Sequence, residues 1–293
     1  MIATTLRGGL GNQMFIYAAA RAMALRNGTD MTFNLHYGFD IDYQFHRKLE
    51  LSNLNVDFGK NNKIATFDYK QPRSIRYISR KLGRNVLAPQ YKFIIEKEPP
   101  FFQKEIFHLQ SKNVYLEGYW QSEKYFADFK EQIRKDFTII TEMPDAIEDE
   151  LSLMWQGTEN LVFIGIRRYQ DCATTTPGMV LEEEYYNKAI QLMESKLTNP
   201  KFVVFTQQPE WAKTHIVAHS PIMYATPKES ELSTIEDMYL MRHCRHAIIS
   251  NSSFYWWGAW LSEYNDGVVV CPTNFNNRDM ALDSWIKFDN TIR

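Results

Sequence analysis

Leu161-Val162-Phe163-Ile164-Gly165-Ile166-Arg167-Arg168 is an apolar run that ends in two adjacent arginines. The run is typical of a buried strand in an α/β sheet, and ligands of such sheets bind outside the carboxyl ends of the strands. The planar guanidinium fork matches phosphate oxygens and stays charged at any working pH. The pair therefore indicates a clamp for a nucleotide diphosphate. The alternative is a strand end whose charges are merely solvated.

The segments around this run repeat the same alternation of strand and helix. Apolar runs predict strands, and periodic runs between them predict helices. The predicted strands cover 161–166, 202–206, 246–250 and 267–271, and the predicted helices cover 182–196, 208–215, 233–244 and 254–262. This order predicts a doubly wound sheet in the second half of the chain.

The N-terminus begins a similar unit. A strand is predicted over residues 2–6 and a helix over 14–26, with the glycine-rich segment Arg7-Gly8-Gly9-Leu10-Gly11-Asn12-Gln13 between them. Glycines let the backbone approach a ligand and present N–H groups at a helix N-terminus, although they also serve plain connections. We expect two Rossmann-like α/β domains, residues 1–150 and 151–293, joined by the charged stretch 142–150.

Composition limits the classes of function. The 293 residues are 44% hydrophobic and 23% charged, which is typical of a globular chain. The net charge of −2 gives no argument for nucleic-acid binding. Three distant cysteines indicate neither a disulfide framework nor a zinc site. No segment reads as a signal peptide or a membrane span, so we expect a cytoplasmic protein.

One stretch is strongly basic. Between Asp68 and Glu96 the chain carries seven basic residues and no acidic one, and the arginines over residues 70–92 recur at helical spacing. A solvated helix face is one interpretation. The other is a site for an anionic acceptor or for peripheral contact with the inner membrane surface.

Two further polar or aromatic segments follow predicted strands. Tyr119 and Trp120 come after a strand over 114–116, where an aromatic pair can stack on a sugar or pack in a core. Asn251, Ser252 and Ser253 lie between a strand and a helix, where hydroxyls and N–H groups can bind phosphate or form an ordinary helix cap.

Three motifs together resemble the bacterial α-1,2-fucosyltransferases of glycosyltransferase family 11. They are Gly8-Gly9-Leu10-Gly11-Asn12-Gln13-Met14-Phe15, Gly118-Tyr119-Trp120-Gln121-Ser122-Glu123-Lys124-Tyr125-Phe126, and Asn251-Ser252-Ser253-Phe254 with Trp256-Trp257-Gly258-Ala259-Trp260-Leu261. The resemblance implies a GT-B fold, two Rossmann-like domains facing a cleft. It also implies inverting transfer of fucose from GDP-fucose to the 2-hydroxyl of a galactoside, free or lipid-linked, with neither metal nor cofactor.

The resemblance also implies roles for individual residues. Asp237 precedes Ser252 by fifteen positions, the spacing at which relatives place the carboxylate that binds guanine. A carboxylate can accept both N–H groups on that edge of the base. Arg167 and Arg168 would bind the pyrophosphate, and Asn251, Ser252 and Ser253 would bind the donor phosphates. Gly9, Gly11 and Asn12 would border the cleft on the donor side. Tyr119 and Trp120 would lie on the acceptor side.

The chain departs from the family pattern HxRRxD. It has Gly165 and Gln170 where the histidine and the acid stand. Glycine cannot make the side-chain contact to nucleotide, and glutamine cannot act as a charged base. We therefore predict Asp171 as the base, with Asp40, Asp42 and Glu123 left open. The alternative functions are a diverged member that uses another GDP-deoxysugar, and a protein that binds nucleotide or glycan without turnover.

Overall fold

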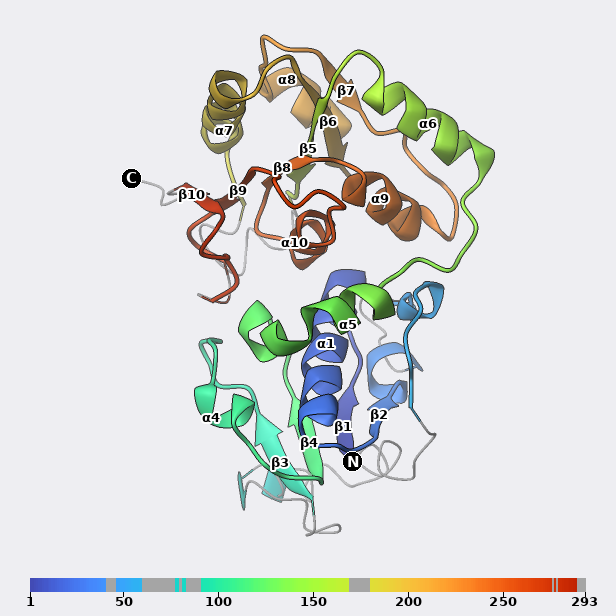
Figure 1. Ribbon diagram of the computed structural model, residues 1–293, viewed down its shortest axis with the longest axis vertical. Helices are drawn as coiled ribbons and strands as arrows, with labels where there is room; N and C mark the ends of the chain where they lie inside the picture. Colours follow the sequence, from blue (N-terminus) through green and yellow to red (C-terminus); the bar gives the residue numbers. More distant parts are fainter. Residues whose placement is uncertain are drawn as a thin grey trace. The chain divides into compact units, whose positions relative to one another are not determined.

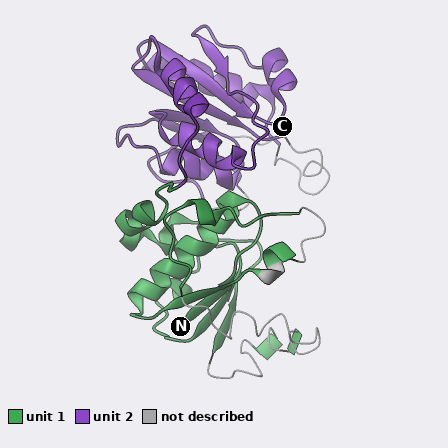
Figure 2. Cartoon of the chain, turned by 90° about the vertical axis from the view of Figure 1, so that its right-hand side faces the viewer, with its two compact units in different colours: residues 1–140 green, residues 141–293 purple. Residues whose placement is uncertain are grey.

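The computed structural model forms two compact units, Met1–Ile140 and Thr141–Arg293 (Figure 2). It describes residues 1–40, 46–59, 77–78, 81–82, 91–168, 180–275, 277 and 279–288, with the backbone alone at 36 and 37. The boundary between the units falls ten residues before the predicted one. A boundary at residue 150 would cut helix α6, Asp145–Trp155, in the stretch expected to be a linker.

Unit 1 is built on a parallel sheet of four strands in the order β2-β1-β4-β3. The strands are β1 Ile2–Thr5, β2 Met31–Asn34, β3 Lys92–Ile95 and β4 Val114–Glu117. Helix α1, Leu10–Arg26, packs on β1 and β2 and buries thirteen of its seventeen residues. The alanine-rich sequence of α1 permits this because small side chains let the helix approach the sheet closely (Figure 1).

Short elements complete unit 1. The helices are α4, Lys104–Phe107, and α5, Lys130–Asp136; a π-helical turn covers His36–Asp40, and 3-10 turns cover Leu51–Asn53, Glu123–Tyr125 and Ala127–Phe129. Buried Asp136 of α5 accepts hydrogen bonds from Tyr17 and Arg21 of α1, both at 3.0 Å. These bonds fix α5 to the central helix.

Unit 2 is built on a parallel sheet of six strands in the order β10-β9-β8-β5-β6-β7. The strands are β5 Asn160–Ile166, β6 Pro200–Thr206, β7 Ile222–Tyr224, β8 His246–Ile249, β9 Val269–Pro272 and β10 Ile286–Phe288. Strands β5, β6 and β8 are almost wholly buried, which agrees with their continuous apolar sequences.

Helices cover the sheet of unit 2 (Figure 1). Besides α6 they are α7 Glu183–Lys196, α8 Pro209–His215, α9 Ser233–Arg242 and α10 Ser253–Trp260. Side chains of α7 and α8 share one core with Val162, Ile164 and Ile166 of β5. Helix α10 packs against α9 and β8, and Tyr255 of α10 lies on Gly165. Alternate residues of β5 therefore face different helices.

The α/β fold class is confirmed in both units. Strands and helices stand where alternation predicts them, with bounds shifted by a few residues. The structure adds β2, β3, β7, β10, α4, α5 and α6, which the sequence analysis did not predict. No helix in the described part of the chain is long and apolar enough to cross a membrane. Most of the basic stretch 70–92, and with it the expected membrane contact, lies outside the described residues.

Candidate active site

The sheet of unit 2 changes direction between β5 and β8. The chain moves from β5 to β6 and β7 on one side and then returns to β8 on the other side. Such a switch point leaves a crevice at the carboxyl ends of the two strands, where ligands of doubly wound sheets bind. Arg167 follows β5 and Ser250 follows β8, and the Ser250 N–H donates to the Gly165 carbonyl at 3.1 Å. The structure thus brings two of the predicted segments together.

Three hydroxyl groups near this switch point are buried, and two of them, those of Tyr186 and Ser250, interact with each other. The three groups belong to Ser250, Ser252 and Tyr186 of α7. Ser252 stands at the N-cap of α10, yet its hydroxyl makes no capping hydrogen bond. The ordinary cap expected as the alternative role of this serine is therefore not formed. A buried hydroxyl without a partner is costly, so the Ser252 hydroxyl is suited to bind a ligand.

Tyr255 explains the glycine at the end of β5. A Cβ at Gly165 would lie 2.3 Å from Cγ of the Tyr255 ring, so no side chain fits there. The Tyr255 hydroxyl donates to the carbonyls of Phe205 at 3.0 Å and Ile166 at 3.3 Å. Burial raises the pKa of Tyr255, Asp237 raises it further, and Arg167 opposes the rise. The ring is therefore within electrostatic range of both Arg167 and Asp237, the residues predicted to bind phosphate and guanine.

The two adjacent arginines differ in their surroundings. Arg168 pairs with Glu182 at 2.8 Å, donates to the Leu181 carbonyl at 2.9 Å, and stacks on the Trp211 ring at 4.0 Å. These contacts fix Arg168 to the start of α7 and to α8. Arg167 is half-buried beside Tyr255 and Tyr186. The structure thus separates the predicted pair into an anchored residue and one at the switch point.

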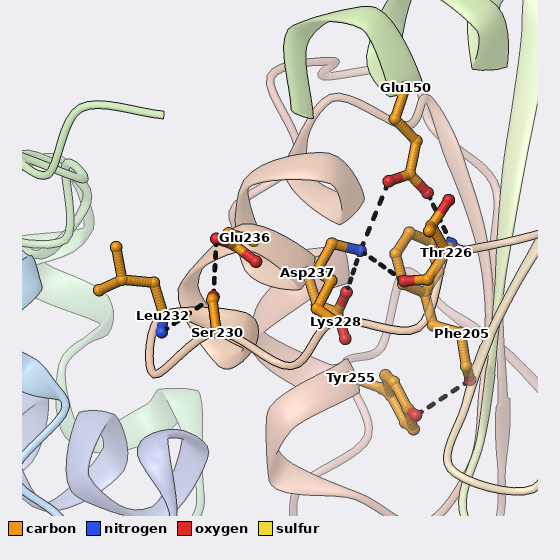
Figure 3. Close-up of polar contacts among 9 residues, drawn as sticks. All are labelled: Glu150, Phe205, Thr226, Lys228, Ser230, Leu232, Glu236, Asp237 and Tyr255. Atoms are coloured by element: carbon orange, nitrogen blue, oxygen red, sulfur yellow. Dashed lines mark hydrogen bonds and ion pairs between the residues drawn. The ribbon is translucent and has the colours of Figure 1, made fainter. Parts of the chain in front are cut away.

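Asp237 lies on α9 and forms an ion pair with Lys228 at 2.9 Å (Figure 3). Burial raises the pKa of Asp237, and the charge of Lys228 opposes that rise. Lys228 was not predicted, because it lies in the loop between β7 and α9 and matches no motif. Nearby, the Asn251 amide donates to the Asn274 carbonyl at 3.1 Å, which ties down the segment after β9. The predicted base, Asp171, lies outside the described residues.

The glycine-rich loop of unit 1 is held by side chains of its own unit. Glu50 accepts a hydrogen bond from the Leu10 N–H at 3.1 Å, so a carboxylate of the protein already lies at the N-terminus of α1. Gln13 donates to the carbonyls of Gly8 and Lys48, both at 2.8 Å. Its amide oxygen accepts from the N–H groups of Glu50 and Leu51. The loop that carries Gly9 and Gly11 is therefore fastened to residues 48–51.

The motifs of residues 8–15 and 118–126 meet at the carboxyl edge of the unit 1 sheet. Asn12 accepts a hydrogen bond from Gln121 at 2.8 Å, and the carboxylate of Glu96 accepts from the N–H groups of Tyr119 and Trp120. The structure places Trp120 in the core, fully buried and edge-on to Tyr125, so its ring offers no face to a sugar.

Tyr119 differs from its neighbour because it is exposed. The Arg7 guanidinium lies over its ring at 4.7 Å. Of the acids left open as a base, Glu123 pairs with Lys130 at 2.9 Å, and Asp42 lies outside the described residues. Within the described part of the chain, no three His, Cys, Asp or Glu side chains gather as metal ligands would.

Comparisons with known proteins agree with this geometry. The model of the family described as Glycosyl transferase family 11 matches residues 1–289. An alpha-1,2-colitosyltransferase of Escherichia coli is 30% identical, with 99% of each chain covered. The O-antigen biosynthesis glycosyltransferase WbnK of the same organism is 30% identical, with 96% of this chain and 98% of the other covered. Human galactoside alpha-(1,2)-fucosyltransferase 1 is 26% identical over 61% of this chain and 50% of its own.

Solved structures support the fold. A mutant of Arabidopsis thaliana FUT1 in complex with GDP matches with a TM-score of 0.54 and 12% identity over 92% of this chain and 69% of the other. Bradyrhizobium fucosyltransferase NodZ matches with a TM-score of 0.52 and 13% identity over 88% of this chain and 90% of the other. These likenesses confirm the predicted GT-B-like fold of two Rossmann-like units.

Proposed function

The chain belongs to glycosyl transferase family 11, and on that premise we propose that it transfers L-fucose from GDP-fucose to the 2-hydroxyl of a galactoside. The transfer inverts the anomeric carbon and needs no metal. Relatives whose names carry this linkage include the human fucosyltransferase and, with another deoxysugar, the colitosyltransferase.

The observation that carries the proposal is the set of buried hydroxyls at the β5–β8 switch point. Ser252 is the N-cap of α10, at the positive end of its dipole, and buried Tyr186 interacts with Ser250 and with the Arg167 backbone. Hydroxyl donors and a guanidinium suit a diphosphate. Asp237, which interacts electrostatically with Tyr255 at the same edge of the sheet, suits the N–H edge of guanine. The set therefore supports a guanosine diphosphate as the group that unit 2 binds.

In the proposed reaction the 2-hydroxyl oxygen bonds to the anomeric carbon as the bond from that carbon to the β-phosphate oxygen breaks. The hydroxyl proton goes to a carboxylate, and the negative charge stays on the departing GDP. Arg167 and the N-terminus of α10 stabilise that charge. We assign the base to Asp171, with Asp40, Asp42 and Glu123 as alternatives.

Two observations favour a second donor. The alpha-1,2-colitosyltransferase matches over 99% of this chain, whereas human fucosyltransferase 1 matches over 61%. Gly165 also removes the histidine contact of the family pattern, and the Tyr255 ring occupies that space with its hydroxyl turned to backbone carbonyls. GDP-colitose, a donor with one hydroxyl fewer on the sugar, is therefore the second candidate.

The test is a transfer assay with the full chain, a β-galactoside and each donor, in the presence of a chelator. We expect an α-1,2-linked product, identified by nuclear magnetic resonance, and the ratio of kcat/KM values identifies the preferred donor. Arg167→Ala should lower kcat about 100-fold or more. Arg245→Ala, which removes a half-buried arginine that precedes β8 and pairs with Asp266, is the matched control. Full turnover in Arg167→Ala would contradict the assignment.

A further inference from the structure

Lys228 is a buried lysine between two carboxylates. It lies in the loop between β7 and α9, and its side chain is 7% exposed. Its ammonium group lies 2.9 Å from Asp237, 3.6 Å from Glu150 of α6 and 3.2 Å from the Thr226 carbonyl. Figure 3 shows the three oxygen partners around one nitrogen. The ammonium group thus donates two hydrogen bonds, to Asp237 and to the Thr226 carbonyl, and forms a longer ion pair with Glu150.

The loop that carries Lys228 is fastened at both ends. Glu150 accepts a hydrogen bond from the Thr226 N–H at 2.8 Å. At the other end, Ser230 donates to Glu236 at 2.8 Å and accepts from the Leu232 N–H at 3.1 Å (Figure 3). Because these bonds connect the loop to α6 and α9, they fix the position of the Lys228 ammonium group within unit 2.

Asp237 is the exposed end of this cluster. Its side chain is 34% exposed, against 7% for both Lys228 and Glu150. Only its Oδ1 atom meets Lys228, and a carboxylate has about four acceptor positions. The pair therefore leaves Asp237 with acceptor capacity that a ligand can use.

Several charges act on Asp237. Burial raises its pKa, Glu150 of α6 and Glu236 of α9 raise it further, and Lys228 opposes them. Asp237 and Arg167 both interact electrostatically with Tyr255 of α10. Lys228 is the cation with the largest effect on this carboxyl group. Without it, two acidic neighbours and burial would favour the protonated form.

We propose that Lys228 is a positioning residue that sets the base specificity of the nucleotide site, an inference that rests on the proposed function. It holds Asp237 ionised and fixed in rotamer, so that both oxygens accept from the N1–H and the exocyclic amine of guanine. Adenine presents an acceptor at that edge and is repelled. Hypoxanthine, the base of inosine, keeps the N1–H and lacks the amine.

The test compares equilibrium binding of GDP and inosine diphosphate to the full chain by calorimetry. The wild type should prefer GDP by about tenfold or more, the effect of one hydrogen bond to a charged acceptor. In Lys228→Met this preference should fall to about threefold or less. The GDP affinity of the variant should also recover as pH rises, because its carboxyl group then ionises at higher pH.

Two further variants separate positioning from folding. Lys228→Met combined with Glu150→Gln removes the carboxylate that the single variant would leave unpaired, so it keeps the test valid if the single variant is unstable. Lys213→Met changes an exposed lysine of α8 and should bind both nucleotides as the wild type does. Lys228→Arg keeps the charge and should restore part of the preference.

Two results would overturn the inference in distinguishable ways. If Lys228→Met keeps both the wild-type preference and the wild-type pH midpoint, Lys228 does not set base specificity, although the nucleotide site remains. If the folded wild type binds neither GDP nor inosine diphosphate, the proposed function fails together with the inference.

Discussion

Gly165 and Tyr255 occupy one volume at the carboxyl end of β5. The nearest three atoms to a Cβ at Gly165 all belong to the Tyr255 ring, at 2.3 to 2.7 Å. These are ring atoms of a side chain that is itself hydrogen-bonded to two backbone carbonyls, so the ring cannot move away easily. Gly165, the residue that replaces the histidine of the family pattern, is therefore required by the packing of Tyr255 of α10 against β5.

We expect Gly165→Ala to destabilise unit 2 by about 1–3 kcal/mol or more, as overpacking does. Tyr255→Ala removes the obstructing ring and should be destabilising by itself. The double variant should be more stable than the sum of the two effects predicts, by about 1 kcal/mol or more. Urea unfolding of the four proteins measures this coupling, and strictly additive effects would refute the shared volume.

The sequence predicted the residues of the candidate site better than their partners. Arg167 follows β5 as expected, because the end of the apolar run in the sequence marks the end of the strand. The anchoring of Arg168 depends on Glu182, fourteen residues further on, and Asp237 depends on Lys228 in another element. Trp120 was expected on the acceptor side, and only the packed sheet shows that its ring is buried. Contacts of this kind come from tertiary structure, which a linear pattern does not contain.

At the scale of elements, the glycine-rich loop and the segment 48–51 behave as one structure. Gln13 is fully buried and makes four side-chain hydrogen bonds across this pair of segments. Glu50 adds the bond to the Leu10 N–H. Because all hydrogen-bonding groups of the buried Gln13 amide have partners, the amide favours a single arrangement of the glycine-rich loop against residues 48–51.

Gln13→Met keeps the side-chain volume and leaves these backbone groups without their partner. We expect a loss of about 2–4 kcal/mol in the stability of unit 1, since each buried unpaired group is costly. Hydrogen-exchange mass spectrometry should show faster exchange at the amides of Glu50 and Leu51. Gln110→Met, at an exposed position of the same unit, is the control. Unchanged protection at residues 48–51 in Gln13→Met would contradict this role.

The elements that the sequence missed have a physical explanation. The missed strands are short, and all of them are edge strands, namely β2, β3, β7 and β10, whereas the predicted strands, some equally short, lie inside their sheets. Helix α6 is rich in acidic residues and was expected to be a linker, yet it buries Ile147, Glu150 and Met154 along one face. The long buried strands β5 and β6 carry continuous apolar sequence and were predicted well.

At the scale of the whole molecule, stability should depend on a buried histidine. His246 of β8 is 4% exposed. Its Nδ1 accepts from the Val268 N–H at 2.9 Å, and its Nε2 lies 3.2 Å from the Asn160 side-chain oxygen. Burial, assisted by the charge of Arg245, lowers the pKa of His246 to about 4. The folded chain therefore holds this ring neutral at pH values where the unfolded chain protonates it.

The unfolded chain binds a proton at His246 near its ordinary pKa of about 6.5, whereas the folded chain does so near 4. The contribution to stability is thus complete above about pH 6.5 and is lost as the pH falls toward 4, by roughly 3 kcal/mol in all. Tryptophan fluorescence during urea unfolding reports mainly on unit 2, which holds six of the seven tryptophans.

His246→Asn, which keeps an acceptor for the Val268 N–H, should be less stable at pH 7 and should lose less stability between pH 6.5 and 4. His219→Asn, at an exposed position, should follow the wild type. Parallel pH profiles for the wild type and His246→Asn would show that His246 does not cause the acid destabilisation.

The measurement that tests the central claim most directly is calorimetric titration of the full chain with GDP in the presence of a chelator. The switch-point site predicts micromolar binding without metal. Arg167→Ala should abolish that binding, Ser252→Ala should weaken it about tenfold while the fold stays intact, and Arg245→Ala should leave it unchanged. Absence of GDP binding in the folded wild type, or equal affinity in Arg167→Ala, would contradict a nucleotide site at the carboxyl ends of β5 and β8.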